Sequence, residues 1–310
     1  MTNIAVVGSF VVGITFGVPR VPVIGETLGS NSFDLGPGGK GSNQAIAAAR
    51  LGAQVSLLAC IGDDIFAEIA VGIYEREGVS FEHIHRIPHV NTGIGVVTLL
   101  PSGENWIIGD FGANRHMTPA HVDAAEALIA NSDIVMTQFE IPLETVARAM
   151  ELGRNYGVMT ILNPAPAEPI EAELLANVDL LTPNETEIRI LLGLPPDDPT
   201  PTLELTKQLL DFGVEQIVVT RGKHGALIVT PDGSAEIPPA NIQAVDVTGA
   251  GDSFNAALAV SLGEGLELRE AVQQANYAGA YAATRLGVID GLPTRAELET
   301  FKLSTSKHLF

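Results

Sequence analysis

Short apolar segments alternate with longer amphipathic segments along most of the chain. The short ones are rich in β-branched residues and almost continuously apolar: Ile4–Val7, Val55–Cys60, Ile134–Thr137, Met159–Leu162, Leu180–Thr182 and Ile217–Thr220. Such runs are typical of parallel strands buried on both faces. The longer ones have helical periodicity: Gln44–Leu51, Ile65–Glu77, Ala120–Ala130, Leu143–Tyr156, Thr186–Leu192 and Leu203–Phe212. The alternation predicts an α/β fold with a doubly wound, mostly parallel sheet flanked by helices.

Two segments interrupt this alternation. Val21–Leu35 is extended and rich in Gly and Ser, and Thr92–Leu100 forms a hairpin pattern with Asn105–Ile108 around a Pro101–Gly103 turn. Neither contains the helix that a parallel crossover requires. We therefore expect a small separate sheet that covers a pocket as a lid.

The remaining segments complete the predicted organisation. The lid would comprise about residues 12–36 and 90–112, inserted in a single domain spanning residues 1–310. Ala256–Ala283 is alanine-rich and predicts two closely packed helices. A thin ribbon is marginal by itself, so pairing of two lids in a homodimer is physically reasonable.

Composition narrows the class of protein. The apolar fraction of 46% over 310 residues is ample for a sizeable core, and no apolar run is long enough to span a bilayer. The formal charge of −20 argues against a nucleic-acid partner, because there is no basic excess to displace counterions from phosphates. The N-terminus lacks the basic segment of a signal peptide, and the single Cys60 allows no intrachain disulfide. These features favour a cytoplasmic protein with no membrane partner.

The most informative motif is the run from Asp246 to Phe254. It places Asp252 directly after a Gly249-Ala250-Gly251 turn and before a predicted helix, Ser253–Gly263. Free backbone N–H groups and the helix dipole at such a turn favour an anion. A carboxylate beside them suits a base that deprotonates a hydroxyl as a phosphoryl group arrives. The alternative is a glycine turn with Asp252 as an ordinary helix N-cap.

A second glycine-rich segment, Pro37–Gln44, precedes a predicted helix at Ala45–Leu51. It is not a Walker A loop, and the first strand is not followed by a dinucleotide-binding Gly-x-Gly-x-x-Gly. Its glycines would let the backbone approach a small polar ligand, to which Lys40 and Asn43 would donate hydrogen bonds. The alternative is a flexible connection with an exposed Lys40.

Three further positions invite both a functional and a structural interpretation. Asn184 and Glu187 lie three residues apart at a helix start, where a capping box explains them as well as ligand binding does. Thr220–Gly225 joins two apolar runs and could be a simple hairpin loop. Glu140 follows a strand at the end where ligands gather in open α/β sheets.

Other polar residues have simpler explanations. Asp63 and Asp64 read as helix caps. Among His83, His85 and His89, Pro88 prevents helical pairing, so solvated strand histidines are expected instead of a metal cluster.

Together these motifs, in this order and spacing, resemble the ribokinase branch of the PfkB carbohydrate kinases from Ile4 to about Pro293. The resemblance implies ATP-dependent phosphorylation of a primary hydroxyl of a small sugar, with Asp252 as general base. The implied anion-binding turn is Gly249, Ala250 and Gly251, and the implied sugar-binding residues are Gly39, Lys40, Gly41, Ser42, Asn43, Glu140 and Asp252.

The resemblance also implies the nucleotide and cation sites. The implied nucleotide-binding residues are Asn184, Thr220, Arg221, Gly222, Lys223, His224, Gly225, Gly251 and Asn276, of which Arg221 and Lys223 rest mainly on their charge. Mg²⁺ would be organised indirectly through Glu187. A monovalent cation, K⁺ as activator, would be held by Asp246, Thr248, Ala282, Arg285, Gly287 and Gly291. In this family the lid also forms the dimer contact, for which Val96, Leu99 and Trp106 are candidates.

The chain departs from the family pattern at three positions. Val11 and Gly13 stand where an Asn and an Asp usually contact the sugar, which puts ribose itself in doubt. Gly291 replaces a usual serine, which would weaken K⁺ activation. A nucleoside kinase with an apolar wall near Val11 and Phe111 therefore remains an alternative, as does a catalytically weak sugar-sensing protein. Phosphofructokinase-type activity would need spare cations, which are not evident near the motifs.

Overall fold

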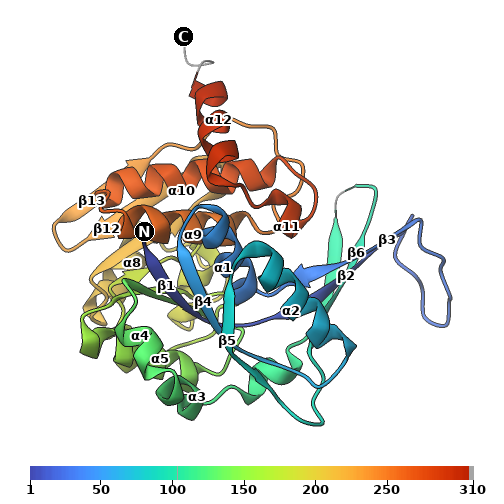
Figure 1. Cartoon of the computed structure of the whole chain (residues 1–310). Coiled ribbons are helices and arrows are strands. Elements are labelled where there is room, and N and C mark those ends of the chain that lie inside the picture. The colour runs from blue at the N-terminus through green and yellow to red at the C-terminus, as the bar shows by residue number, and fades with distance from the viewer. Residues whose placement is uncertain (103, 307–310) are drawn as a thin grey trace.

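A large sheet forms the centre of the computed structural model, which describes residues 1–102 and 104–306 (Figure 1). Its strands, in spatial order, are β13 (Gly233–Ile237), β12 (Ala226–Thr230), β11 (Gln216–Thr220), β10 (Leu180–Leu181), β9 (Met159–Asn163), β8 (Ile134–Gln138), β1 (Asn3–Val7), β4 (Gln54–Ile61) and β5 (Ser80–Arg86). The pairs from β11 to β5 are parallel, and β12 and β13 continue the sheet as antiparallel strands. The predicted mostly parallel sheet is confirmed.

Every strand predicted from an apolar run is present. Of the two edge strands, β5 was indicated only by the strand histidines expected there, and β13 was missed. β5 and β13 lie at the two edges of the sheet, and their sequences, SFEHIHR and GSAEI, are largely polar. An edge strand needs no second buried face, so it lacks the continuous apolar signal. His83 and His85 lie on β5, and the described residues contain no group of three or more metal-ligating side chains.

Helices cover both faces of the sheet. They are α1 (Lys40–Arg50), α2 (Ile65–Glu77), α3 (Pro119–Ala124), α4 (Glu126–Ala130), α5 (Leu143–Tyr156), α6 (Ala172–Leu175), α7 (Glu185–Leu191), α8 (Thr202–Asp211), α9 (Ala250–Gly263), α10 (Leu268–Ala283), α11 (Val288–Gly291) and α12 (Arg295–Ser306), with short 3-10 turns η1 (Gly112–His116) and η2 (Gly222–His224). Alternate residues of β1 enter different cores: Val6 belongs to the hydrophobic cluster that includes residues of α1 and α9, and Val7 belongs to the cluster that includes residues of α5 and α8.

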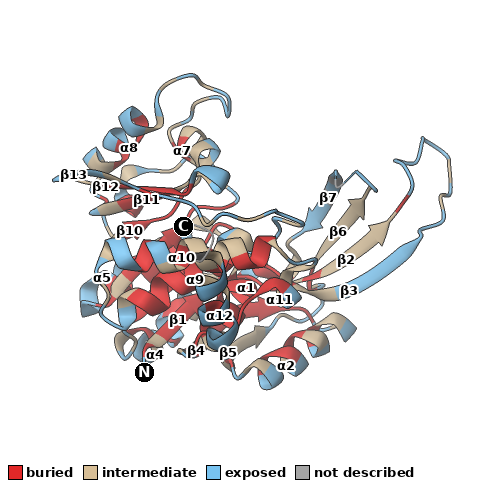
Figure 2. Ribbon diagram, turned by 90° about the horizontal axis from the view of Figure 1, so that it is seen from above, coloured by how far each residue is buried: buried red, intermediate tan, exposed pale blue. Residues whose placement is uncertain are grey.

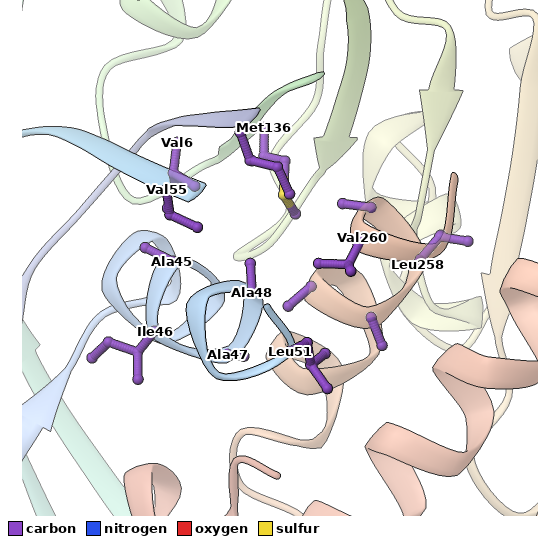
Figure 3. Close-up of a cluster of buried hydrophobic side chains, with 14 of the residues drawn as sticks. Val6, Ala45, Ile46, Ala47, Ala48, Leu51, Val55, Met136, Leu258 and Val260 are labelled. Atoms are coloured by element: carbon purple, nitrogen blue, oxygen red, sulfur yellow. The ribbon is translucent and has the colours of Figure 1, made fainter. Parts of the chain in front are cut away.

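The alanines of α1 and α9 bring these two helices close together under the sheet. Figure 3 shows Ala45 and Ala48 of α1 near Val55 and Met136 of the sheet and Val260 of α9. Small side chains allow this close approach, which joins the first and last thirds of the chain. The two predicted alanine-rich helices, α9 and α10, are also in mutual contact.

Several predicted helix ends differ from the structure. α1 begins at Lys40 and α9 at Ala250, both several residues earlier than expected. The predicted helix Ala120–Ala130 is interrupted at Ala125, and α11 and α12 were not predicted. Of the two expected caps, Asp64 is the N-cap of α2 and Asp63 is not.

A second, smaller sheet extends from the main body (Figure 2). It consists of β3 (Ser32–Gly38), β2 (Val11–Gly17), β6 (Gly93–Leu99) and β7 (Asn105–Asp110), in that order. Both interrupting segments of the sequence therefore contribute to one separate sheet, as expected. Gly103, in the predicted hairpin turn, lies outside the described residues.

None of the helices in the described ranges combines the length and apolar composition that crossing a bilayer requires. Cys60 is buried within β4, and burial raises the pKa of its thiol to about 12. It therefore remains a protonated, small apolar group near neutral pH.

Candidate active site

Asp252 lies in the first turn of α9, at the C-terminal edge of the large sheet. The N-cap of this helix is Gly249, which has φ 78°, so Asp252 is the third helical residue. The interpretation of Asp252 as an N-cap is therefore wrong, as is the predicted start at Ser253. A side chain at position 249 would be strained in this conformation and would approach Val288 Cγ1 to 2.9 Å.

The backbone at this turn leaves fewer free donors than the sequence implied. The N–H of Ala250 donates to the carbonyl oxygen of Val247 at 3.2 Å. Within the described residues the N–H groups of Gly251 and Asp252 have no such partner in a turn or loop. The first turn thus presents a smaller anion-binding group, at the positive end of the helix dipole.

Two side-chain amides hold the carboxylate of Asp252. Asn43 Nδ2 donates to Asp252 Oδ2 at 2.8 Å, and Gln44 Nε2 donates to Asp252 Oδ1 at 3.1 Å. Asp252 is only 6% exposed. The structure thus brings the second glycine-rich segment and the Asp252 turn into direct contact, although 208 positions separate Gln44 from Asp252.

Gln44 belongs to a buried amide chain that sequence reasoning missed. Gln44 Nε2 also donates to Asn163 Oδ1 at 3.0 Å, and Gln138 Nε2 donates to Gln44 Oε1 at 2.7 Å. These residues come from α1, β9 and β8, so the chain fixes α1 to the end of the sheet. The available signal was the occurrence of large polar residues inside otherwise apolar helix and strand patterns.

Residues 40–43 lie in the helix and not in a flexible loop. Gly39 precedes α1 with φ 89°, and a side chain on Gly41 would collide with the backbone nitrogen of Ser9. Both glycines are therefore required by the close approach of α1 to the chain after β1. Ser42 and Asn43 are buried, and Lys40 is partly buried, which excludes the exposed Lys40 considered above.

Lys40 lies among carboxylates. Burial lowers the pKa of its ammonium group, but the charges of Asp252, Glu140 and Glu187 outweigh that effect and raise the pKa above its usual value. Lys40 therefore remains charged at neutral pH and can offer donors to a polar ligand.

Glu140 is linked to the same segment. Its Oε2 accepts hydrogen bonds from Ser9 Oγ at 2.5 Å and from the Lys40 N–H at 2.7 Å. Burial raises the pKa of Glu140, and the charge of Lys40 opposes this shift only in part. Lys40 and Asn43 of α1, Asp252 of α9 and Glu140 in the turn after β8 thus form one polar group.

Asn184 and Glu187 form the capping box that their spacing predicted. Asn184 Oδ1 accepts from the Glu187 N–H at 2.8 Å, and Glu187 Oε2 accepts from the Asn184 N–H at 2.7 Å. Burial raises the pKa of Glu187. Glu187 also faces Lys40 electrostatically, so the start of α7 lies at the same edge as Asp252.

The Thr220–Gly225 segment is a compact turn built around η2. The Arg221 N–H donates to the Gly225 carbonyl oxygen at 2.8 Å, and Gly225 has φ 79° where a side chain would collide with the Ile237 carbonyl. The guanidinium of Arg221 pairs with Glu236 at 3.1 Å. Lys223 and His224 are exposed beside it.

Asn276, on α10, lies near the same end of the sheet. Its Nδ2 donates to the carbonyl oxygen of Pro238 at 3.0 Å, which places α10 against the chain that follows β13. The predicted nucleotide loop and Asn276 therefore flank a common region.

The predicted cation-site residues also converge. Asp246 Oδ1 accepts from the N–H and Oγ1 of Thr248 at 2.9 and 2.7 Å, and Asp246 Oδ2 accepts from the Gly287 N–H at 3.2 Å. A side chain on Gly291 would lie 3.3 Å from the Ala282 carbonyl oxygen. The Arg285 guanidinium lies over the Tyr281 ring at 4.4 Å. Because a guanidinium has no acceptor, only the backbone carbonyl of Arg285 could bind a cation.

A cavity of about 400 Å³ adjoins Glu140. Its lining consists of Phe111, Arg115, Phe139, Glu140, Ile141, Pro142, Pro166, Ala167 and Glu168. Arg115 is a basic side chain near the site that the sequence did not point out. It stacks at 5.9 Å from the Phe111 ring centroid.

A carboxylate beside a helix N-terminus, hydrogen-bond donors and a compact loop at the same sheet edge form the arrangement that a phosphotransferase acting on an alcohol requires. Residues 1–295 match the sequence pattern of the pfkB family carbohydrate kinases. The chain belongs to this family, and it is an ATP-dependent sugar kinase.

Individual relatives are similar over almost their whole length. The ribokinase of Haemophilus influenzae is 36% identical, over 96% of this chain and 98% of that protein. The deoxyribokinase of Salmonella typhimurium is 34% identical, over 94% of this chain and 96% of that protein. The structure of Arabidopsis thaliana ribokinase complexed with ribose and ATP has a TM-score of 0.90 and 30% identity, covering 97% of this chain and 99% of that one.

Proposed function

We propose that the chain transfers the γ-phosphoryl group of ATP to a primary hydroxyl of a small sugar, with Asp252 as the general base. The observation that carries this proposal is the buried carboxylate of Asp252, oriented by Asn43 and Gln44 at the N-terminus of α9. Asp252 takes the hydroxyl proton as the sugar oxygen attacks the phosphorus. The N–H groups of Gly251 and Asp252 stabilise charge on the transferred group.

The sugar would lie among Lys40, Asn43 and Glu140. Asn43 Oδ1 is buried and accepts no hydrogen bond within the described residues, so a sugar hydroxyl would satisfy it. The charged Lys40 provides donors, and Glu140 provides an acceptor, for neighbouring hydroxyls. Gly39, Gly41 and Ser42 supply the close backbone surface of this subsite.

The nucleotide would lie along the Thr220–Gly225 turn, toward Asn184 and Asn276. Its phosphates fit the backbone of Gly222 and Gly225 and the exposed Lys223 and His224 better than Arg221, because Arg221 is paired with Glu236. Gly251 would complete the phosphate end.

Magnesium fits this arrangement only indirectly. Glu187 Oε2 is engaged in the capping box, and no group of three or more ligating side chains occurs among the described residues. Glu187 would therefore act through Mg²⁺-bound water, which suits an ion that usually keeps several waters. Bound Mg²⁺ supplies neutralisation of phosphate charge.

A monovalent cation such as K⁺ fits the oxygen atoms gathered around Asp246. The oxygen ligands available to it are the carboxylate of Asp246, the hydroxyl of Thr248, and the backbone carbonyls of Ala282, Arg285, Gly287 and Gly291. This cluster adjoins the start of α9, so cation binding would stabilise the turn that carries Asp252. Loss of the usual serine at position 291 removes one oxygen and would weaken the effect.

The small sheet would act as a lid, with residues from about 12–36 and 90–112 inserted in one domain. Closing it excludes water, which would otherwise hydrolyse ATP without transfer. The same sheet would join two copies in a homodimer, and the protein would work in the cytoplasm.

Product analysis tests this function. Incubation with ATP and a panel of pentoses and hexoses, followed by ³¹P NMR, should show a phosphomonoester on a primary carbon and one ADP per product. The Asp252→Ala variant should give neither above background. Formation of ADP without a sugar phosphate, or phosphorylation of a secondary hydroxyl, would contradict the proposal.

A further inference from the structure

Two buried polar residues lie behind the first turn of α9. Asn255, on the same helix, is 1% exposed, and so is Thr182, which directly follows β10. The neighbours of Asn255 on α9 are mainly small and apolar, and asparagine is a poor helix former because its side chain competes for backbone groups. A buried polar pair at this place therefore calls for an explanation in terms of its hydrogen bonds.

Asn255 is bonded to the turn that carries Asp252. Its Nδ2 donates to the carbonyl oxygen of Gly251 at 2.9 Å, and its Oδ1 accepts from Thr182 Oγ1 at 2.5 Å. A carbonyl oxygen can only accept, so the amide must turn its Nδ2 toward Gly251 and its Oδ1 toward Thr182. The two contacts together fix which way the amide of Asn255 faces.

The acceptor of the bond from Asn255 is the peptide group that joins Gly251 to Asp252. The carbonyl oxygen of Gly251 and the N–H of Asp252 belong to one planar unit, so holding the oxygen also fixes the direction of the N–H. That N–H is one of the two donors proposed above for the transferred phosphoryl group. A hydrogen bond to the carbonyl oxygen also polarises the peptide group and strengthens its N–H as a donor.

Thr182 is also linked to the carboxylate of Asp252. The carbonyl oxygen of Thr182 accepts from Asn163 Nδ2 at 3.2 Å. Asn163 Oδ1 in turn accepts from Gln44 Nε2, which also donates to Asp252 Oδ1. These hydrogen bonds form one path that starts and ends in the first turn of α9, and we call it the Thr182 path: Asp252, Gln44, Asn163, Thr182, Asn255 and Gly251.

We propose that Thr182 and Asn255 are positioning residues for phosphoryl transfer. They hold the peptide group before Asp252 so that its N–H faces the transferred group while the carboxylate of Asp252 faces the attacking hydroxyl. Both residues act through the turn that carries Asp252 and not by contact with a substrate. The proposal rests on the proposed function, and it adds that one hydrogen-bonded path fixes both the base and the anion-binding N–H.

Thr182→Val tests the positioning role, because both side chains are β-branched and the change removes only the hydroxyl that Asn255 accepts from. The kcat for the sugar that is phosphorylated fastest in the panel above should fall at least about fivefold, since small displacements of reacting groups are costly. Thr182→Ser keeps the hydroxyl and should stay within about twofold of the wild type. Thr206→Val is the matched control, because Thr206 is also buried and its Oγ1 donates to the Leu203 carbonyl oxygen within α8.

Nucleotide binding separates positioning from general damage to the end of β10. The Thr220 N–H donates to the Pro183 carbonyl oxygen at 2.9 Å, so a displaced strand end would also disturb the proposed nucleotide turn. In Thr182→Val the Kd for ADP should change less than about twofold. ADP with aluminium fluoride and the same sugar, which mimics the transferred group, should bind at least about fivefold more weakly in calorimetry. Equal weakening of both, or an unchanged kcat, would overturn the proposal.

A double change tests whether Thr182 acts through Asn255. Asn255→Ala should lower kcat at least about tenfold, because it removes the donor to Gly251 directly. Thr182→Val combined with Asn255→Ala should lose no more kcat than Asn255→Ala alone, because residues that act as a unit are not additive. Losses that multiply would overturn the Thr182 path while leaving the kinase activity established. A wild type that phosphorylates no sugar would instead refute the proposed function.

Discussion

Among single residues, the proposed acceptor site has a polar group around Lys40 and Asp252, but it has Val11 and Gly13 where the family pattern usually has an Asn and an Asp. Both lie on one face of β2, and an added Cβ at Gly13 has space, with its nearest neighbour the Gly36 carbonyl oxygen at 3.6 Å. The double change Val11→Asn with Gly13→Asp should therefore be tolerated. It should raise kcat/KM for D-ribose relative to other sugars by about tenfold, since a site that hydrogen-bonds hydroxyls discriminates strongly. If ribose is already the best substrate and the change harms it, this explanation of the two positions fails.

Glu140 allows a test of the buried charges. Its pKa is raised chiefly by burial, above its ordinary value of 4.5. A group with a raised folded-state pKa contributes stability that is complete below 4.5 and is lost as the pH rises through the folded value. Glu140→Gln does not titrate, so the stability of the wild type should fall relative to this variant as the pH rises above 4.5. Urea unfolding at several pH values measures this, and parallel curves for both proteins would contradict the buried position of Glu140.

Much of the candidate site was visible in the sequence as residue types, but its assembly was not. The glycine turn and Asp252 could be recognised because they are close together in the chain. Gln44, Gln138 and Asn163 were missed because their partners lie on separate elements. Pairing of Arg221 with Glu236 was equally hidden, since β12 and the turn before β13 separate them.

At the scale of elements, the interior strands were predicted well because two buried faces impose an apolar run. Helix starts were predicted less well at α1 and α9, where glycines and buried polar residues look like loop sequence. The first turns of both helices contain buried polar residues, so they lack the apolar periodicity from which a helix start is predicted. Leu99 shows a further limit of prediction from sequence. It pairs with Asn105, and its side chain lies on the opposite face of the sheet from Val96 and Trp106. Those two share a face, because Val96 pairs with Ile108 and Trp106 pairs with Thr98.

The start of α2 is held to the small sheet by Asp64. Its Oδ1 accepts from the N–H groups of Phe66 and Ala67, and its Oδ2 accepts from the Thr92 N–H at 2.7 Å. Asp64→Ala should lower the free energy of unfolding by about 2–3 kcal/mol, because both the cap and the link to Thr92 are lost. Chemical denaturation measures this, with the exposed neighbour Asp63→Ala as the matched control. Equal small effects for the two variants would contradict the cap.

The pH dependence of this contribution has the opposite sign to that of Glu140. Burial alone would raise the pKa of Asp64, but hydrogen bonds from Thr92, Ala67 and Phe66 outweigh it and lower the pKa below 3.8. The contribution is therefore present above 3.8 and is lost as the pH falls through the lower folded value.

At the scale of the whole molecule, the small sheet has an exposed apolar face that a second copy would cover. Phe33 is 61% exposed, Trp106 is 49% exposed and Ile108 is 76% exposed. Phe33 and Trp106 lie on one face of the sheet, because Phe33 pairs with Phe16, Phe16 with Thr98, and Thr98 with Trp106. Open apolar sheets associate unless they are covered. We therefore predict a homodimer at micromolar concentration, measured by light scattering.

Charged substitution should weaken the predicted dimer. Ile108→Asp should shift the protein toward monomer and raise KM for the sugar at least several-fold more than KM for ATP, because the small sheet is proposed to close over the sugar. Ile65→Asp is the matched control, since Ile65 is 78% exposed on α2, outside the small sheet. A wild-type monomer, or equal effects of the two changes, would contradict the lid interface.

The most direct test concerns Asp252, the proposed base of the phosphoryl transfer. Asp252→Asn keeps the size of the side chain and the N–H groups of α9 but removes the proton acceptor. If Asp252 is the base, kcat should fall by about three orders of magnitude or more, and the Kd for ATP should change less than about twofold. Retention of more than about a tenth of the wild-type kcat would contradict the assignment of Asp252 as the base.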